Sequence, residues 1–427
     1  MSSRRPARPA ALTTPADDRM VTISRRFTVV TPVFGGGVRI DKTAPHHKEI
    51  DPVTPVRGAS VRGQLRFWWR ATHGCTCSSI EEMREREGAL WGAASKAGRV
   101  SLTIRVEGEA EPATQIAVYE SNERGGIRAK RGMEEVAYGA FPLQPPKEAS
   151  NKDAGSLSLV GSTYVVSLRV PQENRAEVDD ALTAWTLFGA IGGRGRRGFG
   201  AVHSPDVVSD AAVFVGGFKH LSTLEGVPSL HNAQLVTKEP PRRDGTAQMA
   251  AWSYALGRLQ AFRQGPEIGR NRGQSNSKVP GRSRWPEPEL IREKTRRRSA
   301  KHQALGHVSK APRAIFGLPI ITHFKDKSEG DPTDTKFVPA AEGPEPNQQD
   351  RLASPLILRP LRIGGKWKAA CLLMADPGRG KLRVALDDGR TRHPVEWELT
   401  AEEAEQIRPM QGFGADVLTA FLKFFAK

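Results

Sequence analysis

Three arginines stand four residues apart in one short segment of the chain. Arg62, Arg66 and Arg70 belong to the stretch RGQLRFWWR, which follows Arg57 and Ser60. On a helix this spacing places the three guanidinium groups in one stripe, and guanidinium groups bind phosphate oxygens in pairs. The pattern predicts a helix that begins after Ser60 and presents a row of phosphate-binding groups, with Arg57 just before it. The alternative is a charged helix face that is merely solvated.

A second set of chemical groups lies in the segment IGGRGRRGFG, residues 191–200. It contains five glycines, three arginines and one phenylalanine: Gly192, Gly193, Gly195, Gly198 and Gly200; Arg194, Arg196 and Arg197; Phe199. Glycine lets the backbone approach a phosphate, arginine neutralises its charge, and phenylalanine stacks on a base or packs beneath the loop. The segment follows a predicted helix and precedes a strand, the reverse of a dinucleotide-binding turn, and it lacks a P-loop ending. A flexible linker has no need of three arginines, so we interpret it as a clamp for a phosphate backbone.

A third basic segment spans residues 270–301. Eleven lysines and arginines face three glutamates there, a local charge of +8. It contains Arg282, Arg284 and Trp285 in the string GRSRWP, and the run Arg296-Arg297-Arg298. A loop that follows a polyanion, or a basic segment that becomes ordered on one, would have this composition, and so would a solvated loop.

Catalytic and metal-binding groups are few in this sequence. Four histidines were considered as general acids or bases for ribonucleic acid cleavage: His46, His47, His73 and His203. A histidine in such a position is more often a surface or packing residue than a catalytic one. Neither a Ser/His/Asp arrangement nor a pair of carboxylates stands out in the sequence. We therefore expect no catalytic residue.

The segment His73-Gly-Cys75-Thr-Cys77 offers metal ligands, but it lacks the usual Cys-x-x-Cys pair and a matching second half. We expect neither a metal nor a cofactor. With Cys371 the chain has three cysteines, an odd number that suits a reducing cytoplasm rather than a disulfide framework.

The composition restricts the class of partner. The chain has 427 residues, a formal net charge of +17 and a pI near 10.1, and so basic a surface attracts polyanions. No run of about 20 apolar residues is present to span a bilayer, which leaves nucleic acid as the expected partner and a soluble protein as the expected form. Residues 1–20 lack the apolar core of a secretory signal and are predicted to be a disordered tail.

Hydrophobic periodicity predicts an α+β protein. In the first half the expected elements are strand 25–34, helix 61–72, strand 99–106, strand 162–170, helix 174–191 and strand 199–203. This order is the ferredoxin-like βαββαβ pattern of RNA-recognition domains. In the second half they are helix 246–263, strands 315–324, 355–361 and 367–375, and helix 415–425.

We therefore expect two ferredoxin-like domains, the second more irregular, at residues 21–215 and 216–427. A long insertion at 107–161 and an acidic surface loop at 325–350 interrupt them.

At these motifs the sequence resembles the RAMP superfamily of CRISPR-associated proteins, and within it the first subunit of the Cmr (type III-B) effector complex. The segments that carry the resemblance are TPVFGG at 31–36, the block at 55–70, 188–200, GRSRWPE at 281–287, FGLPI at 316–320 and RLASPL at 351–356. The most specific is RGQLRFWWR, whereas the glycine-rich loop marks only the broader superfamily. The tail, the insertion and the acidic loop depart from the pattern and leave subunit contacts open.

The resemblance implies two ferredoxin-like domains at one end of a multi-subunit ribonucleoprotein, near the 3′ part of the guide RNA. It implies a subunit that is not a nuclease and that contacts guide RNA, target RNA or both, beside other Cmr subunits. We expect the arginine stripe and the glycine-rich loop to clamp the sugar-phosphate backbone without reading sequence. Two alternatives remain open: a metal-independent endonuclease that processes CRISPR RNA, and a structural adaptor that touches RNA little.

Overall fold

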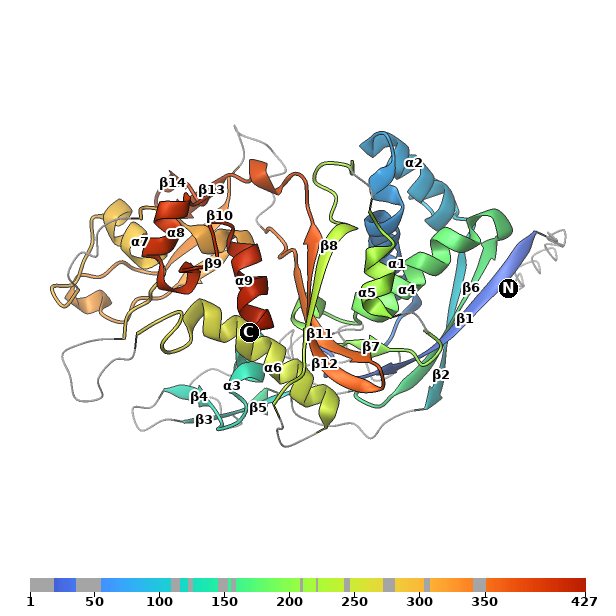
Figure 1. The fold of residues 1–427 in the computed structure, drawn as a ribbon, viewed down its shortest axis with the longest axis horizontal. Coiled ribbons are helices and arrows are strands. Elements are labelled where there is room, and N and C mark those ends of the chain that lie inside the picture. Colours follow the sequence, from blue (N-terminus) through green and yellow to red (C-terminus); the bar gives the residue numbers. More distant parts are fainter. Residues whose placement is uncertain are drawn as a thin grey trace, which may run out of the picture.

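The structure is a computed structural model that describes most of the chain. The described residues are 19–35, 55–108, 116–121, 126–144, 153–154, 159–207, 210–219, 222–241, 246–271, 281–302, 308–340 and 351–427. Helices and strands carry the labels of Figure 1. Nearly all of the predicted tail, His46, His47 and the last ten residues of the predicted acidic loop lie outside the described residues.

A four-stranded antiparallel sheet organises the first half. Its strands are β1 (Met20–Val29), β2 (Ser101–Gly108), β6 (Thr163–Pro171) and β7 (Val202–His203), in the order β2-β6-β1-β7. Side chains of a strand alternate between the two faces, and on β1 Ile23, Phe27 and Val29 are buried. Phe27 and Tyr164, opposite each other on β1 and β6, stack with their centroids 5.4 Å apart. The sheet therefore buries one face and leaves polar residues on the other.

Two helices cover the buried face of this sheet. Helix α1 (Gly58–Thr72) buries Leu65 and both Trp68 and Trp69. Trp69 Nε1 donates to a carboxylate oxygen of Glu177 at 2.8 Å, which joins α1 to α4 (Arg175–Phe188). From Ala181 to Phe188 every residue of α4 is buried, so this helix has protein on all sides.

A third helix on this side, α2 (Ile80–Trp91), was not predicted. It begins at Ser79, whose hydroxyl accepts a hydrogen bond from the backbone N–H of Glu82. Two elements are shorter than predicted: α4 ends at Phe188 rather than at residue 191, and β7 consists of Val202–His203 alone. The glycine-rich loop takes up the difference, since three of its glycines adopt a positive φ that ends regular structure.

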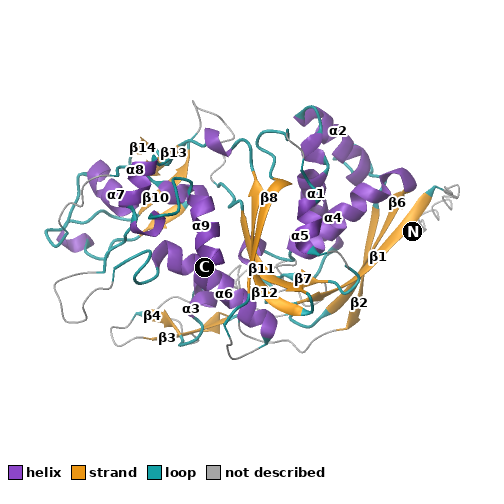
Figure 2. Ribbon diagram, viewed as in Figure 1, coloured by secondary structure: helices purple, strands orange, loops and turns teal. Residues whose placement is uncertain are grey.

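A second sheet packs on the far side of the same helices. It consists of β8 (Ser229–Lys238), β11 (Leu356–Ile363) and β12 (Lys366–Ala375), in the order β11-β12-β8. One face, with Leu230, Ile357 and Leu372, joins the core of α1 and α4. The other face packs on α6 (Ala247–Gln264) and α9 (Val417–Ala426). The layers are thus sheet, helices, sheet, helices (Figures 1 and 2).

The remaining elements are insertions into this arrangement. A four-stranded sheet, ordered β14-β13-β10-β9, contains β9 (Ile320–Thr322), β10 (Thr335–Pro339), β13 (Val384–Asp387) and β14 (Arg392–Val395). Helices α7 (Glu287–Thr295) and α8 (Ala401–Gln406) accompany it. A small sheet has β3 (Ala117–Ser121) between β4 (Ile127–Ala129) and β5 (Asp153–Ala154), and two short helices are α3 (Glu134–Gly139) and α5 (Ala211–Gly216).

The strand predicted at 315–324 is wrong in its first half. Pro312–Phe316 forms a 3-10 helix, and only Ile320–Thr322 is a strand. Pro312 opens the 3-10 turn and Gly317, with a φ of 118°, ends it, so the apolar run is divided between two structures. In the part of the chain that the structure describes, no helix is both long and apolar enough to cross a membrane.

Candidate nucleic-acid interface

The glycine-rich loop lies at the junction between the first sheet and the second. A Cβ added at Gly200, where φ is 62°, would lie 1.9 Å from the carbonyl oxygen of Ile191. A Cβ at Gly198 would lie 2.6 Å from the carbonyl oxygen of Leu358 on β11. Glycine is therefore required here because the loop turns back on itself and because β11 approaches it closely.

The loop arginines face protein rather than open solvent. The Arg194 guanidinium lies 5.7 Å from the ring centroid of Phe34, and Arg196 donates to the carbonyl of Ser354. All three are half-buried. Burial and the neighbouring Arg263 lower the pKa of Arg197 to about 10. The loop joins the two halves of the chain, and its predicted role as an RNA clamp stays a prediction.

Two aromatic residues predicted to contact RNA are instead part of the core. Phe199 has no exposed surface and packs edge-on against Trp252, with centroids 4.8 Å apart. Trp285 is 2% exposed and donates from its indole N–H to the carbonyl of Phe262. Stacking on a base needs an open ring face, which neither side chain offers in this structure; of the two alternatives expected for Phe199, packing beneath the loop is the one observed.

The arginine stripe is present on α1, but α2 lies against it. Arg66 Nε and Arg70 Nη1 both contact Glu87 Oε1, at 2.7 and 2.8 Å, and Arg62 donates to the carbonyl of Trp91. Glu87 is buried at 4% exposure, and about a third of the Arg66 and Arg70 side chains remains exposed. Arg57 precedes the helix and has a buried Nε without a hydrogen-bond partner. The stripe therefore holds α2 in place and offers only its outer edge to a ligand.

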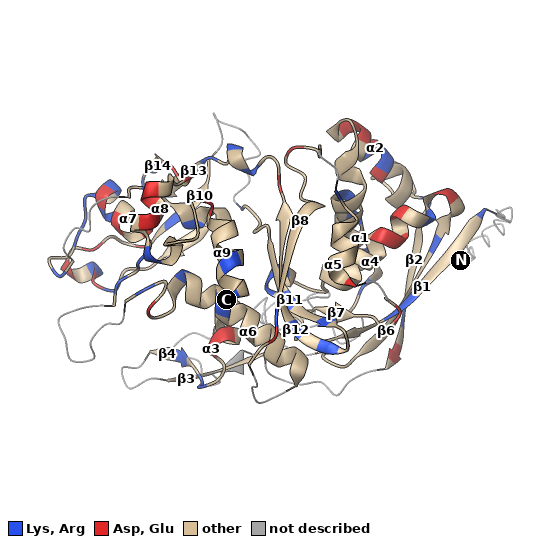
Figure 3. Ribbon diagram, viewed as in Figure 1, with Lys and Arg blue, Asp and Glu red and all other residues tan. Residues whose placement is uncertain are grey.

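A cleft of about 980 Å³ lies between the end of α6, α7 and β9. Six arginines and one lysine line it against three carboxylates: Arg263, Arg270, Arg282, Arg284, Arg292, Arg313 and Lys325; Glu289, Asp326 and Asp331. Basic residues mark the ribbon around α7 in Figure 3. Arg282, Arg284 and Trp285 of the third predicted segment thus come together, with Trp285 as part of the wall.

The inner arginines of the cleft are held by protein carboxylates. Arg313 Nε lies 3.0 Å from a carboxylate oxygen of the buried Glu287. Arg292 contacts both oxygens of Asp331, at 2.9 and 2.8 Å. At the rim Arg284 bonds only a backbone carbonyl, that of Glu267, and Arg270 is exposed. The rim, rather than the floor, has guanidinium groups for an anionic ligand.

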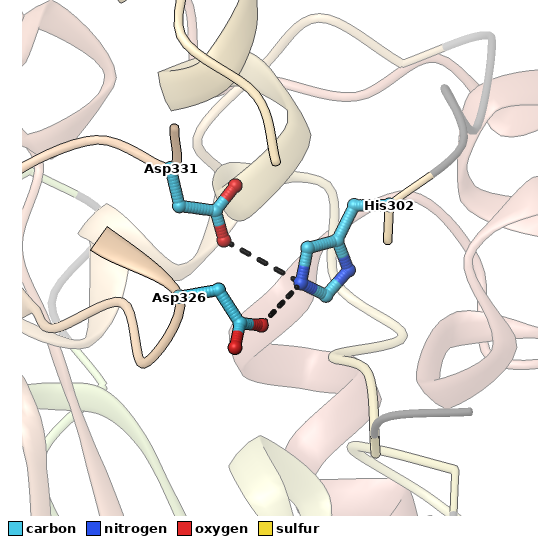
Figure 4. Close-up of side chains that lie close together, drawn as sticks. All are labelled: His302, Asp326 and Asp331. Carbon is cyan, nitrogen blue, oxygen red and sulfur yellow. Dashed lines mark hydrogen bonds and ion pairs between the residues drawn. The ribbon is translucent and has the colours of Figure 1, made fainter. Parts of the chain in front are cut away.

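A histidine and two aspartates meet at the floor of the cleft (Figure 4). His302 Nε2 lies 3.0 Å from Asp326 Oδ2 and 3.4 Å from Asp331 Oδ2. Burial opposes ionisation of Asp331, but hydrogen bonds from Arg292 and Ser299 outweigh it and hold its pKa below the usual value. Because Arg292 occupies both oxygens of Asp331, we interpret the cluster as a buried ion-pair network. Sequence reasoning missed it, since its members lie up to 29 positions apart without a spacing motif.

The other residues considered for chemistry are engaged in the fold. His73 Nε2 lies 2.9 Å from Asp180 Oδ2, and Cys75 is fully buried beside the hydroxyl of Ser229. Burial raises the pKa of the Cys75 thiol. Burial, and then the charges of two arginines, lower the pKa of His203 to about 4. Among the described residues, His73 and the cysteines form no metal-binding group.

Comparison with known proteins gives one family model and several similar solved structures. The model of the RAMP superfamily matches residues 26–203. No curated protein matches the sequence. The crystal structure of Cmr1 from Pyrococcus furiosus (apo form) is similar with a TM-score of 0.43 and 16% identity, covering 91% of this chain and 96% of that one.

Two further solved structures are similar over different lengths. A chain of the type III-B Cmr-beta complex bound to cognate target RNA and AMPPnP, in the presence of ssDNA, has a TM-score of 0.41 and 10% identity, covering 82% and 94%. Cmr6 from Pyrococcus furiosus has a TM-score of 0.22 and 9% identity, covering 43% of this chain and 98% of its own.

Proposed function

Because residues 26–203 match the model of the RAMP superfamily, we propose that this protein is a non-catalytic RNA-binding subunit of a type III-B CRISPR (Cmr) ribonucleoprotein. It contacts guide RNA, target RNA or both near the 3′ end of the guide, beside other Cmr subunits in the cytoplasm. The observation that carries the proposal is the basic cleft, whose rim presents Arg270 and Arg284. Such groups neutralise phosphates and contribute affinity without reading sequence.

The proposed fold of both halves is ferredoxin-like. In the first half the chain order β1-α1-β2-β6-α4-β7 and the sheet order β2-β6-β1-β7 support it. In the second half β8, α6, β11, β12 and α9 follow the same chain order, and their sheet order is β11-β12-β8. Among the described residues no fourth strand joins this sheet in the place that β7 has in the first.

The state of the histidines supports the non-catalytic part of the proposal. The low pKa of His203 makes it a weak base near neutral pH, and its Nε2 is buried. His73 is paired with Asp180, and His302 is 7% exposed. A histidine that transfers protons to RNA must reach a 2′-hydroxyl; His302 and the Nε2 of His203 are buried, and the part-exposed His73 has its Nε2 paired with Asp180.

The test is binding of a labelled single-stranded RNA to the full chain in EDTA across a salt series, with the RNA examined for cleavage afterwards. We expect intact RNA, tight binding at low salt and a steep salt dependence. The double variant R270A/R284A should make the slope shallower by roughly 1.4, since each single-strand phosphate contact contributes about 0.7. Cleaved RNA would favour the endonuclease, and weak binding without salt dependence would favour the adaptor.

A further inference from the structure

The face of the first sheet that points away from α1 and α4 is polar and uncovered within the described residues. Its side chains are mostly hydroxyls and arginines, at least partly exposed, with one valine and one glutamate among them: Thr22, Ser24, Arg26 and Thr28 on β1; Thr163, Val165, Ser167 and Arg169 on β6; Ser101, Thr103, Arg105 and Glu107 on β2. The strand registers place them side by side, because residues opposite each other share a face. We refer to this set as the open face.

The open face differs in composition from the face of the second sheet that packs against helices. The face that receives α1 and α4 presents Leu230, Ile357, Leu361 and Leu372, all buried. On the open face the hydroxyls bond one another instead, as Ser24 Oγ and Ser167 Oγ do at 2.8 Å. With Val165 as its one apolar side chain, this mostly hydroxyl and charged surface gains little by excluding water, so an apolar helix or a lipid does not fit it.

The charges on the open face favour an anion. Arg26 Nε and Arg105 Nη2 share one carboxylate, Glu107, at 2.6 and 3.0 Å. Asp206 lies at the edge, where it accepts from the backbone N–H of Arg26. Arg169 is exposed, and its cross-strand neighbours are the uncharged Thr22 and Ser101. Hydroxyls and guanidinium groups together are the side chains that most often contact phosphates and sugars.

An aromatic pair continues the open face at its β7 end. His203 stands opposite Thr28, so it shares that face, and its ring lies 5.3 Å from the ring of Trp367. Trp367 is half-buried and stands opposite the exposed Arg362 at the tip of the β11–β12 hairpin. Figure 3 shows basic residues on both β1 and this hairpin. An unstacked base of a single strand can stack on a partly exposed tryptophan, and a neighbouring arginine can contact its phosphate.

We propose that the open face is a second RNA-binding surface, where Arg26, Arg105 and Arg169 contact successive phosphates of a single strand and Trp367 stacks on a base. This inference rests on the proposed function and extends it from the cleft to the opposite part of the molecule (Figure 1). Binding here is independent of sequence, because no group on the face is fixed toward a base edge.

The experiment measures the affinity of the full chain for a labelled single-stranded RNA across a salt series. The variant R26A/R105A/R169A is compared with R131A/R390A/R408A, which removes the same charge from exposed arginines outside the first sheet. We expect the first variant to make the salt slope shallower by roughly 2 and the second to leave it within error of the wild type. The variant W367L should bind roughly 5- to 100-fold more weakly with an unchanged slope.

The outcomes separate this inference from the function on which it rests. A wild-type chain that binds no RNA refutes the proposed function. A wild-type chain that binds RNA, with R26A/R105A/R169A no different from R131A/R390A/R408A, refutes the open face and leaves the proposed function standing. Thermal unfolding of each variant checks that these surface substitutions leave the fold intact.

Discussion

Arg359 offers the sharpest test of how the two halves are joined. It lies on β11 at 2% exposure, and its guanidinium donates to backbone carbonyls at the end of α4 and in β7. Nη1 lies 2.8 Å from the carbonyl oxygen of Gly189, and Nη2 donates to Thr186 and Val202. Burial lowers the pKa of Arg359 to about 9, the mark of a cation without a carboxylate partner.

The expected effect of Arg359→Ala follows from two opposing contributions. Three carbonyls lose their donor, and an unsatisfied buried acceptor costs about 1–3 kcal/mol. Removing a buried cation returns part of this, because its desolvation no longer opposes folding. We expect the free energy of unfolding to fall by about 3 kcal/mol, and Arg359→Met, which restores volume but not the donors, to recover about 1 kcal/mol.

The assay is urea denaturation followed by tryptophan fluorescence, and the matched control is Arg362→Ala. Arg362 lies three positions along the same strand but is exposed, so its loss should change the free energy of unfolding by less than about 0.5 kcal/mol. A denaturation midpoint for Arg359→Ala that coincides with that of Arg362→Ala would refute the idea that Arg359 joins the halves.

Three further outcomes are expected from the geometry. Gly200→Ala should lower the free energy of unfolding by roughly 2–4 kcal/mol, because its Cβ meets the Ile191 carbonyl at a positive φ; thermal unfolding measures it, and an unchanged midpoint contradicts the loop path. The pKa of His203, about 4 when folded against an ordinary 6.5, means that stability is lost as pH falls from 6.5 toward 4; His203→Asn should flatten that part of the pH profile, and an identical profile would count against it. Asp331→Asn should cost roughly 3 kcal/mol in urea denaturation, because the buried Arg292 then keeps Glu289 as its one carboxylate partner and His302 loses the Asp331 carboxylate; a gain in stability would argue against the ion-pair network.

Local sequence patterns were sufficient for much of the first half. The stripe Arg62, Arg66 and Arg70 does lie on one helix, since helical spacing depends only on neighbours along the chain. Helix α2 was missed although Ser79 and Glu82 carry a recognisable start signal, because the segment after it reads as a charged stretch. Without α2, nothing indicated that Glu87 would neutralise the stripe.

The glycine-rich loop shows where composition misleads. Glycine and arginine are the residues of a phosphate clamp. They are equally the residues of a loop packed between two sheets, where glycine permits close backbone approach and arginine bonds backbone carbonyls. Ser354 and Trp252, the partners of Arg196 and of the Arg197 carbonyl, lie far away in the sequence. Only the tertiary structure brings them together, so no local pattern could separate the two meanings.

The order of the layers has a consequence for synthesis of the chain. Helix α4, buried on all sides from Ala181 to Phe188, is made before β11 and β12, which lie at Leu356–Ile363 and Lys366–Ala375. More than a third of the chain lies between Phe188 and Leu356. On the ribosome the side of α4 that meets β11 and β12 therefore stays uncovered while that part is translated. During that interval the nascent first half is an intermediate with exposed apolar surface, and it needs protection from aggregation. Release of a truncated chain would leave the same surface permanently exposed.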